Sequence, residues 1–206
     1  VVDTRDLEEH QARVREGWGA AMLYLGVDAG ADLPHEAHHL ELVGDSEAPF
    51  MEGNHVFCSV SGVDEYERSP TGDRTVTCST HVPMDELLGR DEDERGPYVA
   101  GIQEAMRRTI ERRAPELYAS ITIEMTASPR TFERFTARPE GFVGGIPRRA
   151  GLQNYRGIFP GESLPGLHLV GDSVFPGQST LACAIGGVRV ADKIAGRGVR
   201  REYRRG

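Results

Sequence analysis

The chain has 206 residues, enough for one large domain or two small ones with a buried core. A formal net charge of −8 argues against a nucleic-acid-binding surface, and no apolar run approaches the roughly 20 residues that a membrane span needs. Three cysteines without metal-like spacing, together with the absence of a recognisable signal peptide, favour a reducing, cytoplasmic location.

Four apolar or alternating segments in the first part of the chain predict the strands of a largely antiparallel sheet. They are Trp18–Val27, His38–Val43, His55–Ser61 and Arg74–Val82. Short polar stretches separate them, and short connections are typical of antiparallel neighbours.

After the four predicted strands, apolar residues recur at the spacing of a helix. Apolar residues recur on one side of Pro97–Arg113, which predicts an amphipathic helix that ends before Pro115. Ile121–Ala127 alternates as a further strand, and residues 128–135 read as a short capped helix with an early proline. The residues 141–161 are rich in glycine and arginine and are expected to form an irregular loop, which at such a length is usually functional or disordered.

The last part of the chain combines a short strand, an acidic turn and a helix of small apolar residues. Leu167–Val170 is the predicted strand, Gly171-Asp172 follows it, and Leu181–Ala195 is the predicted helix with Ser179 or Thr180 as its N-cap. Because ligands of open α/β sheets bind where strands end and helices begin, we expect a ligand at this turn.

A flavin suits this turn chemically. Asp172 can accept hydrogen bonds from ribityl hydroxyls, and the positive end of the helix can face the ring edge on which reduction places negative charge. A buried strand–helix corner in which Asp172 only caps a turn is the structural alternative. The spacing by itself leaves both open.

The stretch from Gly166 to Ala195 resembles the C-terminal flavin-binding segment of the carotenoid desaturase and isomerase family, which includes phytoene desaturases, carotenoid isomerases and retinol saturase-like enzymes. Further segments resemble, in the same order, that family's substrate-domain sheet, a short helical segment and a glycine-rich loop. These are Leu33-Pro34 with His38-His39, Ser69–Gly72, His81–Pro83, Ser128–Phe132 and Gly141–Pro147. The resemblance therefore covers nearly the whole chain.

The resemblance implies a mixed α/β fold, an FAD cofactor and an apolar isoprenoid or polyene substrate such as a carotenoid. Residues 1–140 would form the substrate-binding domain, a mixed or antiparallel sheet with helices. Residues 141–206 would form the C-terminal FAD-binding segment, the strand and helix that close a Rossmann-like, amine oxidase-like domain. The implied cofactor-binding residues are Gly171, Asp172, Pro176, Gly177, Gln178, Ser179 and Thr180. No catalytic residue is identified.

One departure from the family bears on the cofactor. The family's FAD pyrophosphate is bound by a strand–G-x-G-x-x-G–helix unit, and the sequence contains no such fingerprint. We therefore expect that part of the site from a longer chain or from a partner chain. The expected function is FAD-dependent desaturation, isomerisation or saturation of an apolar isoprenoid, by a chain that is a C-terminal fragment or a split subunit.

Two alternatives to this function stay open: a non-catalytic fragment or partner subunit, and a module that binds apolar lipid without flavin. The basic tail at residues 197–205 also leaves open a peripheral contact with an anionic membrane, beside a simply solvated terminus.

The segment His35–His39 matches the zinc-binding pattern H-E-x-x-H. That chemistry needs both histidines on one face of a helix, whereas here a proline precedes the match and a predicted strand follows it. We therefore expect no metal site. His55, His81 and His168 lie on predicted strands and are expected to be half-buried structural residues.

Three further sets of residues, an acidic residue, two cysteines and two arginines, have expected roles. Glu124 alternates with apolar neighbours on a predicted strand, so we expect it to face solvent. Cys58 and Cys78 are expected to pack, reduced, on neighbouring strands. Arg148 and Arg149 in the glycine-rich loop either approach FAD phosphate or solvate the loop, and the sequence does not decide between these roles.

Overall fold

The computed structural model describes residues 5–69, 71–147, 162–164, 166–174 and 177–196. The chain divides into two compact units. One unit is Trp18–Val143, and the other joins Val1–Gly17 to Gly144–Gly206.

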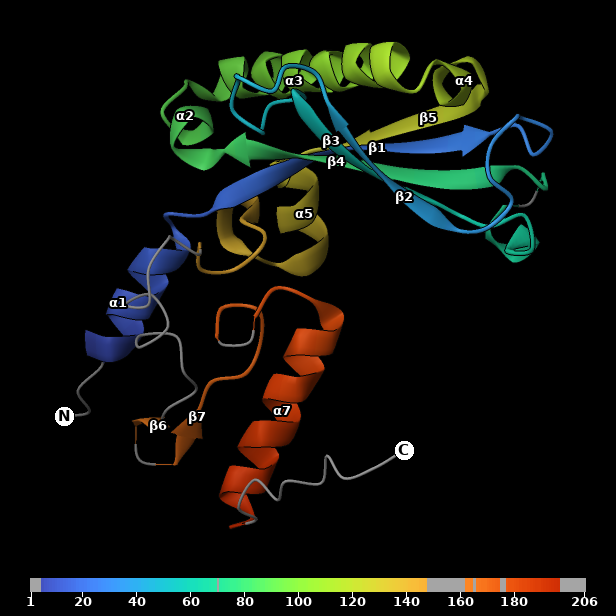
Figure 1. Cartoon of the computed structure of the whole chain (residues 1–206). Coiled ribbons are helices and arrows are strands. Elements are labelled where there is room, and N and C mark those ends of the chain that lie inside the picture. The colour runs from blue at the N-terminus through green and yellow to red at the C-terminus, as the bar shows by residue number, and fades with distance from the viewer. Residues whose placement is uncertain (1–4, 70, 148–161, 165, 175–176, 197–206) are drawn as a thin grey trace. The chain divides into compact units, whose positions relative to one another are not determined.

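The unit Trp18–Val143 is built on a five-stranded antiparallel sheet in the order β2-β3-β4-β1-β5 (Figure 1). Its strands are β1 (Trp18–Val27), β2 (His38–Val43), β3 (His55–Val60), β4 (Arg74–Pro83) and β5 (Ile121–Ala127). All five strands expected from the sequence are confirmed. The alternation that predicted them matches the period of two by which side chains leave opposite faces of a strand.

Helices lie on both faces of this sheet, the longest of them on one face and a shorter one on the other (Figure 1). The helical segments of this unit are α2 (Met84–Leu88), α3 (Glu92–Arg113), α4 (Pro115–Ala119), α5 (Pro129–Thr136) and the short 3-10 turns η1 (Tyr66–Arg68) and η2 (Pro139–Gly141). The helix α3 begins at Glu92 rather than at Pro97, because acidic residues occupy its first turn, where they favour the positive end of the helix. It ends before Pro115, as expected.

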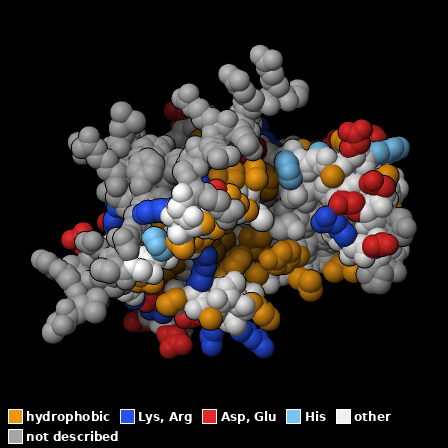
Figure 2. Space-filling view, turned by 90° about the horizontal axis from the view of Figure 1, so that it is seen from below, with side chains coloured by type: hydrophobic (Ala, Val, Ile, Leu, Met, Phe, Trp, Pro, Cys, Tyr) orange, Lys and Arg blue, Asp and Glu red, His pale blue; other side chains and the backbone are white. Residues whose placement is uncertain are grey.

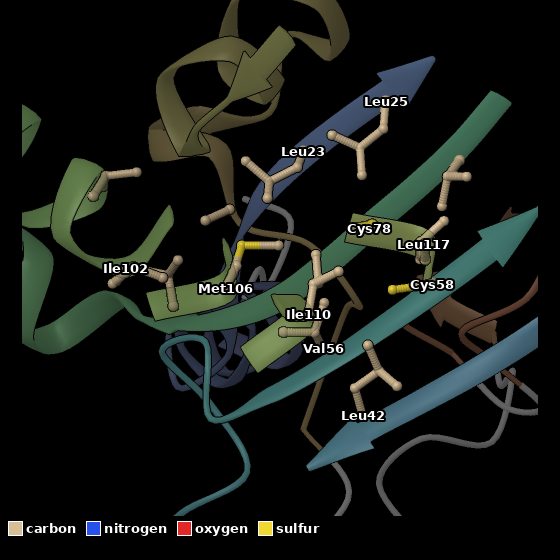
Figure 3. Close-up of a cluster of buried hydrophobic side chains, with 14 of the residues drawn as sticks. Leu23, Leu25, Leu42, Val56, Cys58, Cys78, Ile102, Met106, Ile110 and Leu117 are labelled. Carbon is tan, nitrogen blue, oxygen red and sulfur yellow. The ribbon is translucent and has the colours of Figure 1, made fainter. Parts of the chain in front are cut away.

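The main core lies between α3 and the sheet face that it covers. Figure 3 shows side chains of β1, β2, β3 and β4 pointing toward Ile102, Met106 and Ile110 of α3 and toward Leu117 of α4. Leu23 and Met106 are fully buried, with exposed fractions of 0%. A smaller cluster on the opposite face joins β1 and β5 to Phe132 of α5.

Glu124 is exposed, as expected from the sequence, but it also pairs with a helix. Glu124 lies on the helix-covered face, where Arg107 of α3 donates to its carboxylate with an Nε–Oε1 distance of 3.0 Å. Its apolar neighbours Ile123 and Met125, on the other face of the strand, are 54% and 63% exposed. Alternation shows that two faces differ, but the register of β5 against β1 decides which face meets the helix.

Cys58 and Cys78 are directly opposite each other in β3 and β4, and both are fully buried, reduced thiols. A hydrogen bond with Cys58 and burial raise the pKa of the Cys78 thiol, so little of the reactive thiolate forms. Cys183, by contrast, is half-buried.

We expect a thiol reagent such as dithionitrobenzoate to modify Cys183 quickly in the folded protein, and Cys58 and Cys78 only after denaturation. The release of nitrothiobenzoate with and without urea, followed by peptide mapping, measures this order. Fast modification of all three thiols in the folded protein would contradict the packing of β3 against β4.

The second unit contains α1 (Arg5–Val14), β6 (Glu162–Leu164), β7 (Leu167–His168) and α7 (Thr180–Ile194). The expected strand Leu167–Val170 is shortened to two residues, which pair with β6 in an antiparallel hairpin. Leu167 and Val170 are 40% and 50% exposed. The expected Rossmann-like architecture is therefore not confirmed, since a central parallel strand is buried only when neighbouring strands and helices cover both faces.

Candidate functional site

The turn that follows β7 contains most of the residues predicted to bind a cofactor. Gly171 has φ of +139°, a conformation that favours glycine, and its carbonyl accepts from Val174 N–H at 3.3 Å. Asp172 is half-buried, and its Oδ1 accepts from the Ser173 hydroxyl at 3.4 Å. Pro176 lies outside the described residues.

The glycine-rich loop packs against this turn within the same unit. A Cβ added to Gly145, whose φ is +65°, would lie 2.5 Å from the Asp172 carbonyl oxygen and 2.9 Å from Ser173 N. The Gln178 side chain donates to the Ile146 carbonyl at 3.2 Å. The loop and the turn, separated by more than twenty residues of sequence, thus form one structure around the Asp172 backbone.

The turn leads directly into α7. Ser179 is its N-cap, and the Ser179 hydroxyl accepts from Ala182 N–H at 3.1 Å, as expected for one of the two predicted capping residues. Gly177 is buried and has φ of +76°, whereas Gln178, Ser179 and Thr180 are exposed. The first backbone N–H groups of a helix have no partner inside it, so this end of α7 favours an electron-rich group.

These residues fit the edge of a flavin. Gly171 has no atom within 4 Å of the position that a Cβ would take, so an approaching ligand meets backbone and open space there. A half-buried carboxylate stands beside it, and the positive end of a helix of fifteen residues follows. The donor and acceptor types match ribityl hydroxyls and a ring carbonyl edge. Arg148 and Arg149, the other candidates for FAD contact, lie outside the described residues.

The face of the five-stranded sheet turned away from α3 is the second feature of functional interest. The helix α5 covers Ala20, Met22 and Ala127 at one end of it. Beyond that end, Ile123 and Met125 on β5 are exposed, and Tyr24 of β1 lies between β5 and β4. Figure 2 views the molecule from below and shows hydrophobic side chains exposed in the middle of the view.

The same face becomes polar across β4 and β3. The residues of β4 that point to it are Thr75, Thr77, Ser79 and His81, and those of β3 are His55, Phe57 and Ser59. The sequence predicted that the sheet of residues 18–82 walls the substrate site, but it did not identify this row of hydroxyl groups. The alternation of hydroxyl and apolar residues in Arg74–Pro83 was the signal that could have identified the row.

The histidines of this face contact neighbouring side chains, and His81, which was expected to be half-buried, is exposed. His81 packs on Trp18 with a ring-centroid distance of 4.7 Å, and partial desolvation of its ring together with the neighbouring His55 lowers the pKa of His81. His55 pairs with the carboxylate of Glu41. His168, in the other unit, has a buried Nδ1 that bonds to no other described residue.

The H-E-x-x-H segment does not form a helix. Residues 35–37 lie in a bend before β2, and His38 and His39 begin that strand. Within the described ranges, no group of three or more histidine, cysteine or acidic side chains is placed to hold a metal ion. Among the same residues, no helix is both long enough and apolar enough to cross a membrane.

Comparison with known proteins shows which proteins the chain is similar to. No family model matches it. Prolycopene isomerase, chloroplastic, of Arabidopsis thaliana is 30% identical over 178 residues, which are 84% of this chain and 29% of that protein. The protein of the same name from Daucus carota is 28% identical over 177 residues, 84% of this chain and 28% of its own length.

Prolycopene isomerase 2, chloroplastic, of an Oncidium hybrid cultivar is 29% identical over 180 residues, 84% of this chain and 30% of that protein. The chain thus spans less than a third of the length of the curated relatives it matches. The resemblance predicted from the sequence is confirmed, since the chain is similar to these carotenoid isomerases over 84% of its length.

Proposed function

We propose that this chain is part of an FAD-dependent oxidoreductase or isomerase that acts on an apolar isoprenoid such as a carotenoid. The observation that carries the proposal is the turn at residues 171–180, which combines a carboxylate, a helix N-terminus and a tightly packed glycine-rich loop. The names of the curated relatives support the substrate class.

Within this proposal, FAD supplies the capacity to accept and return hydride equivalents. Asp172 holds the ribityl chain by accepting hydrogen bonds from its hydroxyls. The backbone N–H groups at Gly177–Thr180 orient the ring edge, and the positive end of α7 stabilises negative charge there. Gly145 keeps the Asp172 backbone in place, because only a residue without a Cβ fits against it.

The open sheet face of the other unit is the proposed wall for the substrate. Ile123, Met125 and Tyr24 offer apolar surface to a hydrocarbon chain. Neighbouring exposed apolar side chains of this kind are typical of binding sites. The buried side chains Ala20, Met22 and Ala127 adjoin that wall on the same face, where α5 covers them.

The proposal includes a further unit that binds the FAD pyrophosphate. The sequence lacks a G-x-G-x-x-G fingerprint, and α7 presents an apolar stripe to solvent in which Leu181, Ile185 and Val188 are 70%, 40% and 61% exposed. A nucleotide-binding unit, on the same polypeptide or on a partner chain, would cover this stripe.

Flavin binding tests the proposal. The chain is purified alone and after co-expression with the polypeptide encoded immediately upstream of Val1, and visible flavin absorbance is measured in both. Removing a charged acceptor from a flavin hydroxyl weakens binding about tenfold or more, so Asp172→Ala should lower flavin affinity by that factor. Asp192→Ala, at another half-buried aspartate of the same unit, is the matched control and should bind flavin normally.

The outcomes separate the alternatives. Flavin bound only in the presence of the upstream polypeptide supports the split or truncated site. A colourless complex in both preparations contradicts the FAD proposal, and isoprenoid binding by that colourless protein would favour the lipid-binding module. Equal flavin affinity of the Asp172→Ala and Asp192→Ala variants would remove Asp172 from the site.

A further inference from the structure

The open sheet face is divided into an apolar part and a hydroxyl-bearing part. Thr77 and Ser79 of β4 project from it, and Ser59 of β3 is paired directly with Thr77. All three residues are half-buried. Within the described part of the chain, none of their hydroxyls takes part in a side-chain hydrogen bond.

On the β5 side of this face, the distribution is the reverse of that on a sheet face that water alone covers, whereas the other edge strand, β2, presents the polar His39 and Glu41 to it. An edge strand is the most exposed strand of a sheet, so a solvated face is expected to be polar there. Here the edge strand β5 presents exposed Ile123 and Met125, whereas the hydroxyls lie on the interior strands β3 and β4. This pattern calls for an occupant that is apolar over β5 and polar over β4.

The register gives the spacing of the two parts. Tyr24 of β1 is paired with Met125 on one side and with Thr77 on the other, so β1 alone separates the apolar and hydroxyl rows. Adjacent strands lie about 4.8 Å apart, which places the rows about 10 Å apart. A single prenyl chain that crosses the strands is long enough to contact both.

We propose that the isoprenoid bound by this chain carries an oxygen function, a hydroxyl or a carbonyl, that hydrogen-bonds to Ser59, Thr77 and Ser79 while its hydrocarbon part lies over Met125 and Ile123. This inference rests on the proposed function, since it takes an isoprenoid as the ligand of the face. A purely hydrocarbon ligand would leave the half-buried hydroxyls without partners, which disfavours its binding.

The test compares two ligands that differ in one group: geranylgeraniol and the same chain with a methyl group in place of the hydroxymethyl group. Trp18, the only tryptophan in the sequence, lies on β1 beside His81, so quenching of its fluorescence reports binding to this face. We expect the alcohol to bind about tenfold more tightly than the hydrocarbon.

The variant Thr77→Val keeps the shape of the side chain and removes the hydroxyl. It should weaken binding of the alcohol about three- to tenfold and leave the affinity for the hydrocarbon unchanged. Thr126→Val on β5 changes the same residue type on the opposite face of the sheet and is the matched control. Urea midpoints of both variants verify that they are folded.

Equal affinity of the wild-type chain for the two ligands overturns the inference while leaving isoprenoid binding intact, and so does an equal loss of both affinities in Thr77→Val. Failure of both ligands to bind contradicts the isoprenoid ligand itself and therefore the proposed function. A preference for the alcohol that Thr77→Val abolishes supports the assignment.

Discussion

Replacing Met106 by alanine is expected to lower the free energy of unfolding by about 2–5 kcal/mol, the usual cost of removing a large buried side chain. Met106 is fully buried where α3 packs on the sheet, and its loss leaves a cavity that surrounding strands cannot easily close. Urea unfolding, followed by the fluorescence of Trp18 on β1, measures the change.

Met125→Ala is the matched control for this prediction. It removes the same atoms from a residue that is 63% exposed on the open face, so we expect a change within about 0.5 kcal/mol. A comparable loss of unfolding free energy in the two variants would mean that other parts of the protein pack on the open face, and that Met125 of β5 is not exposed there. An unchanged slope of free energy against urea shows that both variants unfold in the same way.

Replacing Gly145 by alanine is expected to weaken flavin binding about tenfold or more. The added Cβ would lie 2.5 Å from the Asp172 carbonyl oxygen, a distance that side-chain movement cannot relieve because the neighbour is backbone. The turn that holds Asp172 must therefore shift, and a positive φ adds strain for alanine. Flavin affinity measured with the upstream polypeptide present gives the size of the effect.

Gly166→Ala is the control that separates the steric clash with the Asp172 backbone from the strain of a positive φ. Gly166 also has a left-handed φ, of +79°, but no atom lies within 4 Å of its added Cβ. This variant should bind flavin nearly as the wild-type chain does. Hydrogen exchange of the amides at residues 177–180 provides a readout without flavin: it should accelerate in Gly145→Ala and stay unchanged in Gly166→Ala. Unchanged exchange in both variants would contradict the packing of the loop on the turn.

Sequence periodicity identified the strands of the larger unit and the position of α3, because alternation and helical spacing are local properties of the chain. It misplaced the start of α3, since the polar first turn carries no apolar periodicity. It did not reveal that the exposed Glu124 pairs with Arg107 of α3, because a strand's pattern shows that its faces differ without showing which of them a helix will cover.

The candidate flavin site follows a similar division. Asp172 and the capping role of Ser179 could be predicted from residue types and spacing, and the capping bond is present. The close packing of the Asp172 backbone against Gly145 could not be predicted, because a contact between residues so far apart in sequence depends on how the loop folds back. The expected strand Leu167–Val170 is short, since only Leu167 and His168 pair with β6, and this pairing too depends on how the chain folds back.

By itself, the sequence determined the resemblance to carotenoid isomerases, the five strands of the larger unit, the position of α3, and the turn that carries Asp172. Only the tertiary structure decided which face of the sheet α3 covers, that Thr77 and Ser59 stand side by side on the open face, and that Gly145 meets Asp172. The physical reason is that strand register and loop packing are chosen by the summed burial of many distant side chains, which no local pattern contains.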